Sequence, residues 1–300
     1  MQFNENAELD TSQVTDQRGV GGRVALGGGG LGIVGLIIYF VLSQIGGGAQ
    51  LPSGSGFGDV GRDQQVGSQA IADKCRTGAD ANRETDCRAV AFINSIQAFW
   101  SDQFARSSRT YERAQTNFFS GGVQTRCGNA TSAVGPFYCP ADGQVYIDLT
   151  FYQELEQKFG ATGGPFVEAY ILAHEYGHHV QNLLGTSDRL GQEAGPASGS
   201  VRLELQADCY AGAWANHAQT VPTGSGQPLI TGVTQEDVNA ALDAAARIGD
   251  DYIQSELGGG HVDTTQFTHG SSAQRQKWYT TGYETGDPAR CNTFDTNNLG

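Results

Sequence analysis

The sequence predicts an α+β fold that is mainly helical, has a small β-sheet and follows one transmembrane helix. Apolar residues recur at helical spacing in residues 88–105, 163–184 and 201–218, as in helices that bury one face. Residues 144–151, QVYIDLTF, alternate and are β-branched or aromatic, which is typical of a strand. Residues 24–45 carry no charged side chain and supply the transmembrane segment.

Two further helices are indicated by residues that cap helix starts. Thr234 begins one of them, with Asp237 completing a capping box. Ser271 or Ser272 caps a last helix, which contains Trp278.

The chain divides into four parts. Residues 1–23 are polar and lack apolar periodicity, so we expect a disordered cytoplasmic tail. Residues 24–45, as a helix, rise about 33 Å, enough to cross a hydrocarbon core of ~30 Å. Residues 46–66 are rich in Gly, Ser and Gln, as in a flexible linker, and residues 67–300 form the folded domain.

The charges around residues 24–45 predict how this segment sits in the membrane. A cleaved signal peptide is the rival interpretation, but the preceding segment is long and acidic, which favours an uncleaved anchor. Arg18 and Arg23 precede the segment and only Arg62 follows soon after it, so the N-terminus is expected in the cytoplasm. Gly28 and Gly32 form a weak GxxxG signal for a homo-oligomer.

The six cysteines predict disulfide bonds and an oxidising compartment, which agrees with a domain outside the cytoplasm. Six cysteines allow 15 pairings, and buried free thiols are the alternative. Proximity in the sequence favours the pairs Cys75–Cys87, Cys127–Cys139 and Cys209–Cys291.

The charge balance excludes one class of partner. Asp plus Glu number 32 and Lys plus Arg 18, for a net charge of −14. Nucleic-acid binding needs clustered cations, so we expect no nucleic-acid partner.

One helix carries the strongest chemical motif. Residues 174–178 read HEYGH, an HExxH motif within the predicted helix 163–184. Residues four apart share a helix face, so His174 and His178 can hold one Zn²⁺, and Glu175 can act as the base.

A zinc site that catalyses hydrolysis needs a third protein ligand. The extended HExxHxxGxxH pattern is absent, because Gln181 and Leu184 stand where it needs Gly and His. Glu204 on the next helix is the favoured ligand and Asp188, in a loop, is the rival. Asp208, four residues after Glu204, is expected to accept the imidazole N–H of a ligand histidine.

The chain resembles the bacterial, membrane-anchored neutral zinc metallopeptidases, zincins that take their third ligand from a glutamate. The resemblance rests on CGNATSAVGPFYCPADGQVYIDLTF, AYILAHEYGHHVQNLLG, RLELQADCYAGAWA, AARIGDD and FTHGSSAQRQKWYTTGYETGDPARC, which cover most of residues 120–291. It implies a zincin fold that is anchored to the bacterial inner membrane, with the catalytic domain outside the cytoplasm, one Zn²⁺ per chain and hydrolysis of a peptide or protein substrate. The implied ligands are His174, His178 and Glu204, with Glu175 as base.

A zincin of this kind needs a donor for the oxyanion besides zinc, and His269 is the candidate. Arg275 is expected to form an internal ion pair, with Asp250 or Asp251 as its partner. His179 points about 100° away from His178 around the helix, so it is not expected to share the zinc site.

A second function remains open from the sequence. The chain could be a membrane-tethered scaffold or binding protein whose zinc is structural. Such a site closes its fourth position with a protein ligand, and an unpaired Cys209 would supply one.

Overall fold

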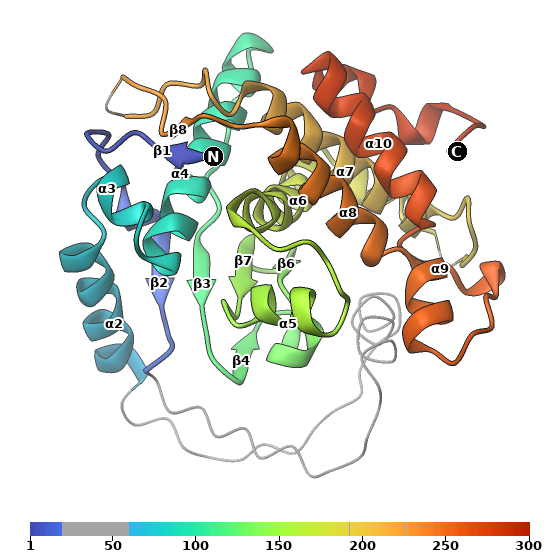
Figure 1. The fold of residues 1–300 in the computed structure, drawn as a ribbon, viewed down its shortest axis with the longest axis horizontal. Coiled ribbons are helices and arrows are strands. Elements are labelled where there is room, and N and C mark those ends of the chain that lie inside the picture. Colours follow the sequence, from blue (N-terminus) through green and yellow to red (C-terminus); the bar gives the residue numbers. More distant parts are fainter. Residues whose placement is uncertain (20–59, 192, 225) are drawn as a thin grey trace.

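A computed structural model describes residues 1–19, 60–191, 193–224 and 226–300. It has an α+β fold dominated by helices, as predicted (Figure 1). The predicted transmembrane segment 24–45, with Gly28 and Gly32, lies outside the described residues. Within the described ranges, no helix combines the length and apolar character needed to span a membrane.

In the described ranges, the longest helices are α4 with 22 residues and α6 and α7 with 19 each, and the strands have two to four residues. The helices are α2 (Val60–Lys74), α3 (Gly78–Ala81), α4 (Thr85–Arg106), α5 (Phe151–Gln157), α6 (Pro165–Leu183), α7 (Gly199–His217), α8 (Gln235–Arg247), α9 (Asp250–Tyr252) and α10 (Ser272–Thr285). The strands are β1 (Gln2–Phe3), β2 (Val14–Asp16), β3 (Thr116–Phe118), β4 (Gly122–Thr125), β5 (Gly128–Thr131), β6 (Phe137–Cys139), β7 (Gln144–Ile147) and β8 (Ile230–Thr231).

A four-stranded mixed sheet has the order β2–β3–β7–β6. The first three strands are parallel, and β6 pairs antiparallel to β7 at one edge. Helix α6 packs on β6 and β7 of this sheet and on the helices α4, α7 and α8. The HExxH helix therefore lies between the sheet and the other large helices (Figure 1).

A glycine permits the close contact between α6 and α7. A Cβ atom at Gly177 would lie 2.9 Å from the Ala207 Cα atom, so no larger residue fits there without moving a helix. This contact places the middle of α7 against the part of α6 that carries the HExxH motif. The close approach of the α6 and α7 backbones therefore helps to bring the residues of the two helices together.

The predicted helices at 88–105, 163–184 and 201–218 correspond to α4, α6 and α7. The capping box predicted at Thr234 is present before α8. Of the two predicted caps of the last helix, Ser271 is the N-cap of α10, and it also forms a capping box with Gln274. The predicted strand 144–151 is too long. It ends at Ile147 because the Asp148 carboxylate accepts the Thr150 backbone N–H (3.0 Å), which turns the chain into α5.

The prediction of a disordered tail at residues 1–23 is wrong for the part that the structure describes. Strand β1 pairs with β8, and β2 joins the main sheet beside β3. The tail was misassigned because strands of two or three residues leave no periodic pattern. The predicted linker 46–66 is also too long, since α2 begins at Val60.

All three disulfides join the cysteine pairs that sequence proximity favours. Cys75–Cys87 joins the end of α2 to the start of α4. Cys127–Cys139 ties the turn after β4 to strand β6, and Cys209–Cys291 ties α7 to the C-terminal segment.

Candidate active site

Helices α6 and α7 bring His174, His178 and Glu204 together. The Nε2 atoms of the two histidines are 3.2 Å apart. The Glu204 carboxylate lies 3.1 Å from Nε2 of His174 and 3.4 Å from Nε2 of His178. These two nitrogens and the two carboxylate oxygens point at a common space.

The spacing of these atoms fits a tetrahedral zinc ion. Two nitrogens bound at 2.0–2.1 Å in tetrahedral geometry are separated by roughly 3.3 Å, close to the 3.2 Å between the imidazoles. The three ligand atoms lie within 4.8 Å of one another. Two imidazoles and one carboxylate are also the donor set of a zinc site with an open fourth position.

Asp208 fixes the orientation of the first histidine. Its Oδ1 atom lies 2.9 Å from Nδ1 of His174, so Nδ1 carries the proton and Nε2 is left to bind a metal. Burial lowers the pKa of His174, but the carboxylates of Asp208 and Glu204 outweigh it and raise that pKa to about 10. The same carboxylates favour a metal cation.

Asp208 is itself held by a buried network. It is fully buried and accepts hydrogen bonds from Nε of Arg275 (2.8 Å) and from the Tyr170 hydroxyl (2.7 Å). Burial raises the pKa of Asp208, but Arg275 and His174 hold it at about 2. The expected pairing of Arg275 with Asp250 or Asp251 is therefore wrong. Arg275 points from α10 toward α7, where Asp208 is the buried carboxylate that meets it.

Gln181 orients the second histidine, a role that the sequence analysis missed. Its Oε1 atom lies 2.9 Å from Nδ1 of His178. Its amide nitrogen donates to the Leu203 carbonyl (2.7 Å), which fixes which end of the side chain faces the histidine. The i to i+3 spacing on one helix was the available signal.

Glu175 lies at the wall of the same cavity, one residue after the first ligand, and is nearly buried. Burial raises the pKa of its carboxyl, opposed by the neighbouring histidines and by a hydrogen bond from the Tyr138 backbone. Tyr138 belongs to the edge strand β6. The edge of the sheet therefore lies next to this carboxylate.

His269 also lines the cavity, and Asp250 holds it in place. Oδ1 of Asp250 lies 3.3 Å from Nδ1 of His269. Oδ2 accepts the backbone N–H groups of Thr268, His269 and Gly270 at 2.7–2.9 Å. Burial lowers the pKa of His269, but Glu204 and Asp250 outweigh it and raise that pKa, which favours a histidine that can donate.

These side chains open into a cavity of about 460 Å³. It follows α6 from Ile171 to Asn182, a distance of roughly 16 Å at 1.5 Å per residue. The wall also includes the apolar side chains of Phe151, Phe159 and Ile253. The cavity is long enough for an extended segment of several residues.

Neither Asp188, the rival ligand, nor His179 belongs to the ligand cluster. Asp188 also lines the cavity, but it is exposed and is not in the cluster of His174, His178 and Glu204. His179 is buried away from the cluster, with Nε2 2.7 Å from the Glu112 carbonyl and Nδ1 3.2 Å from the Tyr138 hydroxyl. It supports β6.

Cys209 cannot close the fourth position of the site as a thiolate, because it is bonded to Cys291. In the part of the chain that the structure describes, the cluster contains only the two histidines and Glu204. A structural zinc site closed by Cys209 would need a free thiol at that position, and Cys209 has none.

Comparisons with known proteins place the chain in a family. A family described as "Putative neutral zinc metallopeptidase" matches residues 2–294. The uncharacterized protein Rv2575 of Mycobacterium tuberculosis is 53% identical over 229 residues, 76% of each chain. The uncharacterized protein YpfJ of Escherichia coli K12 is 37% identical over 299 residues, 95% of this chain and 96% of that protein. No solved structure matches the chain. The chain therefore belongs to the family described as putative neutral zinc metallopeptidases.

Proposed function

We propose that this protein is a zinc-dependent peptidase with a zincin fold, in which Glu175 is the general base. The observation that carries the proposal is the convergence of His174, His178 and Glu204 on one space at the wall of an open cavity. Asp208 and Gln181 each occupy the other ring nitrogen of a ligand histidine. Such partners fix the tautomer that binds metal.

The residues around this space have distinct roles. The chemistry that a zinc ion supplies there is Lewis acidity, which polarises a carbonyl and lowers the pKa of water to about 7. Glu175 accepts the proton of the attacking water and delivers it to the leaving amine. His269, held by Asp250, donates a hydrogen bond to the oxyanion that develops on the scissile carbonyl.

The cavity supports an apolar preference in the substrate. Its wall includes the apolar side chains of Phe151, Phe159, Ile171 and Ile253. A large apolar side chain next to the scissile bond would be removed from water there. We therefore expect faster cleavage of peptides with Phe or Leu at that position than of those with Ser or Glu.

We also propose that the folded domain works outside the cytoplasm, at the bacterial cell membrane. Three disulfides in one domain are typical of an oxidising compartment. The apolar segment 24–45 is the proposed attachment to the membrane.

The test compares the full-length protein with Glu175→Gln, a change that keeps the shape of the side chain and removes its basicity. Zinc content is measured by metal analysis, and turnover with a diverse library of quenched fluorogenic peptides. Glu112→Gln makes the same chemical change at an exposed glutamate and serves as control.

We expect one zinc in all three proteins and turnover in all but Glu175→Gln. Zinc without turnover in the parent would favour a scaffold or binding protein. A folded parent without zinc would refute the metal site, and equal turnover in Glu175→Gln would refute the role of the base.

A further inference from the structure

Residues 1–18 are built into the folded domain rather than resting on its surface. The backbone N–H of Leu9 donates to the Arg76 carbonyl (2.9 Å), and that of Gln17 to the Phe118 carbonyl (2.7 Å). Strand β2 runs parallel to β3, in the register Val14 to Thr116. The segment supplies one edge strand of the sheet that supports α6.

Side chains of this segment complete the core. Phe3, Ala7 and Val14 are at most 4% exposed. Buried Asn94 on α4 uses both ends of its amide on the backbone of Asp10, at 2.8 and 2.9 Å. Without the segment, this amide would lose both of these partners.

The backbone approaches are too close for a chance contact. A Cβ atom at Gly67 would lie 2.5 Å from the Asp16 carbonyl oxygen, and one at Gly78 would overlap the Asn4 carbonyl oxygen. Because glycine has no side chain, these two positions leave room for the backbone of the N-terminal segment.

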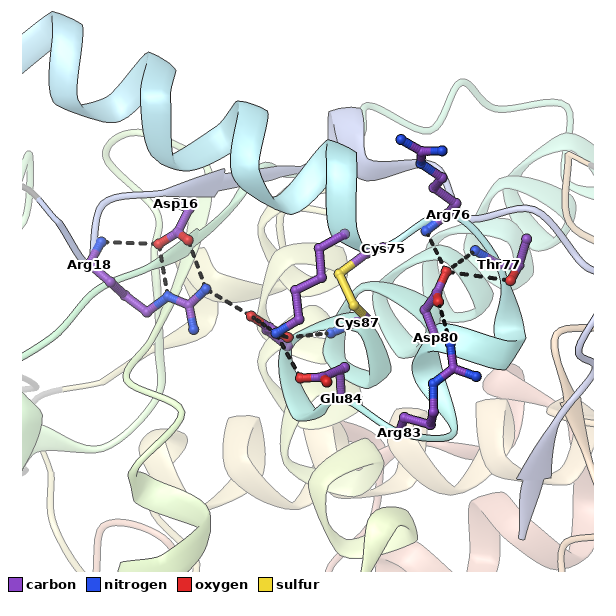
Figure 2. Close-up of a disulfide and its surroundings, with 11 residues drawn as sticks. Asp16, Arg18, Cys75, Arg76, Thr77, Asp80, Arg83, Glu84 and Cys87 are labelled. Atoms are coloured by element: carbon purple, nitrogen blue, oxygen red, sulfur yellow. Dashed lines mark hydrogen bonds and ion pairs between the residues drawn. A yellow bond between two sulfur atoms is a disulfide. The ribbon is translucent and has the colours of Figure 1, made fainter.

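A network of ion pairs beside the Cys75–Cys87 disulfide anchors the end of the segment (Figure 2). Arg18 binds the Asp16 carboxylate and reaches Asp86 at 3.1 Å. Lys74 binds the same Asp86 at 3.0 Å. The disulfide joins Cys75 and Cys87, the neighbours of Lys74 and Asp86, and so holds Lys74 beside the carboxylate that also binds Arg18. Its two sulfurs are covalently joined, so the cluster of Cys75, Asp86 and Cys87 is not a thiolate metal site.

We propose that Met1–Arg18 is an integral part of the domain and lies on the same side of the membrane as residues 60–300. A strand that is hydrogen-bonded within a sheet cannot be separated from it by a bilayer. A single crossing between Gly19 and Val60 would place the N-terminal segment and the domain on opposite sides of the membrane. We therefore replace the cytoplasmic N-terminus that the arginine distribution predicts with an N-terminus on the same side as the domain. The inference is independent of peptidase activity.

The first test measures the side of the membrane with full-length protein in cells whose cytoplasmic membrane is intact. Asn6→Cys and Glu236→Cys each introduce one exposed thiol, on the N-terminal segment and on α8. The six native cysteines form the three disulfides and leave no free thiol. A membrane-impermeant maleimide should label both variants to the same extent. Labelling of Asn6→Cys only after permeabilisation, with Glu236→Cys labelled before it, would overturn the proposal.

The second test measures docking directly. Gln2 and Thr231 are exposed partners in the antiparallel β1–β8 pair, where Cα atoms are about 4.5–5.5 Å apart, within disulfide range. In the double variant Gln2→Cys/Thr231→Cys, mild oxidation should link the peptides that carry positions 2 and 231, as seen by mass spectrometry. Gln2→Cys/Glu256→Cys, whose second position is exposed on the distant segment after α9, is the mismatched control (Figure 1). Equal linkage in the control, or none in the test variant, would overturn the docking.

Discussion

Replacing Asp208 by Asn tests the buried network behind the first zinc ligand. Asp208 is fully buried and receives Arg275, Tyr170 and His174. The amide keeps the shape but leaves the buried Arg275 charge without a counter-ion. Breaking a buried pair in this way costs about 3–5 kcal/mol. Loss of the partner of a ligand histidine also lowers metal affinity by roughly 10–100-fold.

Two measurements separate these effects. Urea unfolding of the zinc-free protein gives the free energy of unfolding, and competition with a chromophoric chelator gives the zinc affinity. Asp208→Asn/Arg275→Met removes the uncompensated charge, so it should recover part of the stability but not the zinc affinity. Asp243→Asn, at a surface pair with Arg247, is the matched control and should change neither by much. A zinc affinity in Asp208→Asn within twofold of the parent would refute the reasoning.

The remaining predictions concern catalysis, specificity and the N-terminal segment. His269→Ala should retain zinc and lower kcat by about 10²–10³, while the same change at exposed His261 should have little effect; an unchanged kcat would remove His269 from the mechanism. Ile253→Glu should abolish the preference for apolar peptides, measured as a ratio of kcat/KM values, and Leu257→Glu, exposed on the same segment, should preserve it. Arg18→Met should lower the free energy of unfolding by about 1 kcal/mol at pH 7. Burial raises the pKa of Asp86, but Lys74 and Arg18 outweigh it and lower that pKa. A lowered pKa stabilises the fold above the unfolded value of about 3.9. The effect of Arg18→Met should therefore shrink in urea titrations as the pH falls below about 4, and a pH-independent difference would contradict the ion pair.

The features predicted from the sequence are those encoded within one element. HExxH lies on one helix, and Glu204 and Asp208 lie four apart on the next, so helical spacing alone shows that each pair shares a face. The three disulfides followed from short loops between the first four cysteines, which left the last two.

What the sequence did not reveal depends on contacts between elements. Asp250, in the segment after α8, binds His269. Arg275 pairs with Asp208, and no local pattern in the sequence favours Asp208 over Asp250 or Asp251 as its partner. The N-terminal strands were missed because Gln2–Phe3 and Val14–Asp16 are too short for periodicity. Their stability comes from β8 and β3, more than 100 residues away in the chain at the closest.

Zinc binding and helix packing are coupled through one imidazole. The His174 ring on α6 meets Glu204 at Nε2 and Asp208 at Nδ1, and these carboxylates are four residues apart on α7. Four residues rise about 6 Å, so the ring spans successive turns of the neighbouring helix. A shift of α7 by one turn would break both contacts at once. The close approach at Gly177 and the Cys209–Cys291 bond beside Asp208 both oppose such a shift. The geometry of the site is therefore a property of the α6–α7 pair, and a substitution that separates these helices should weaken zinc binding without altering any ligand.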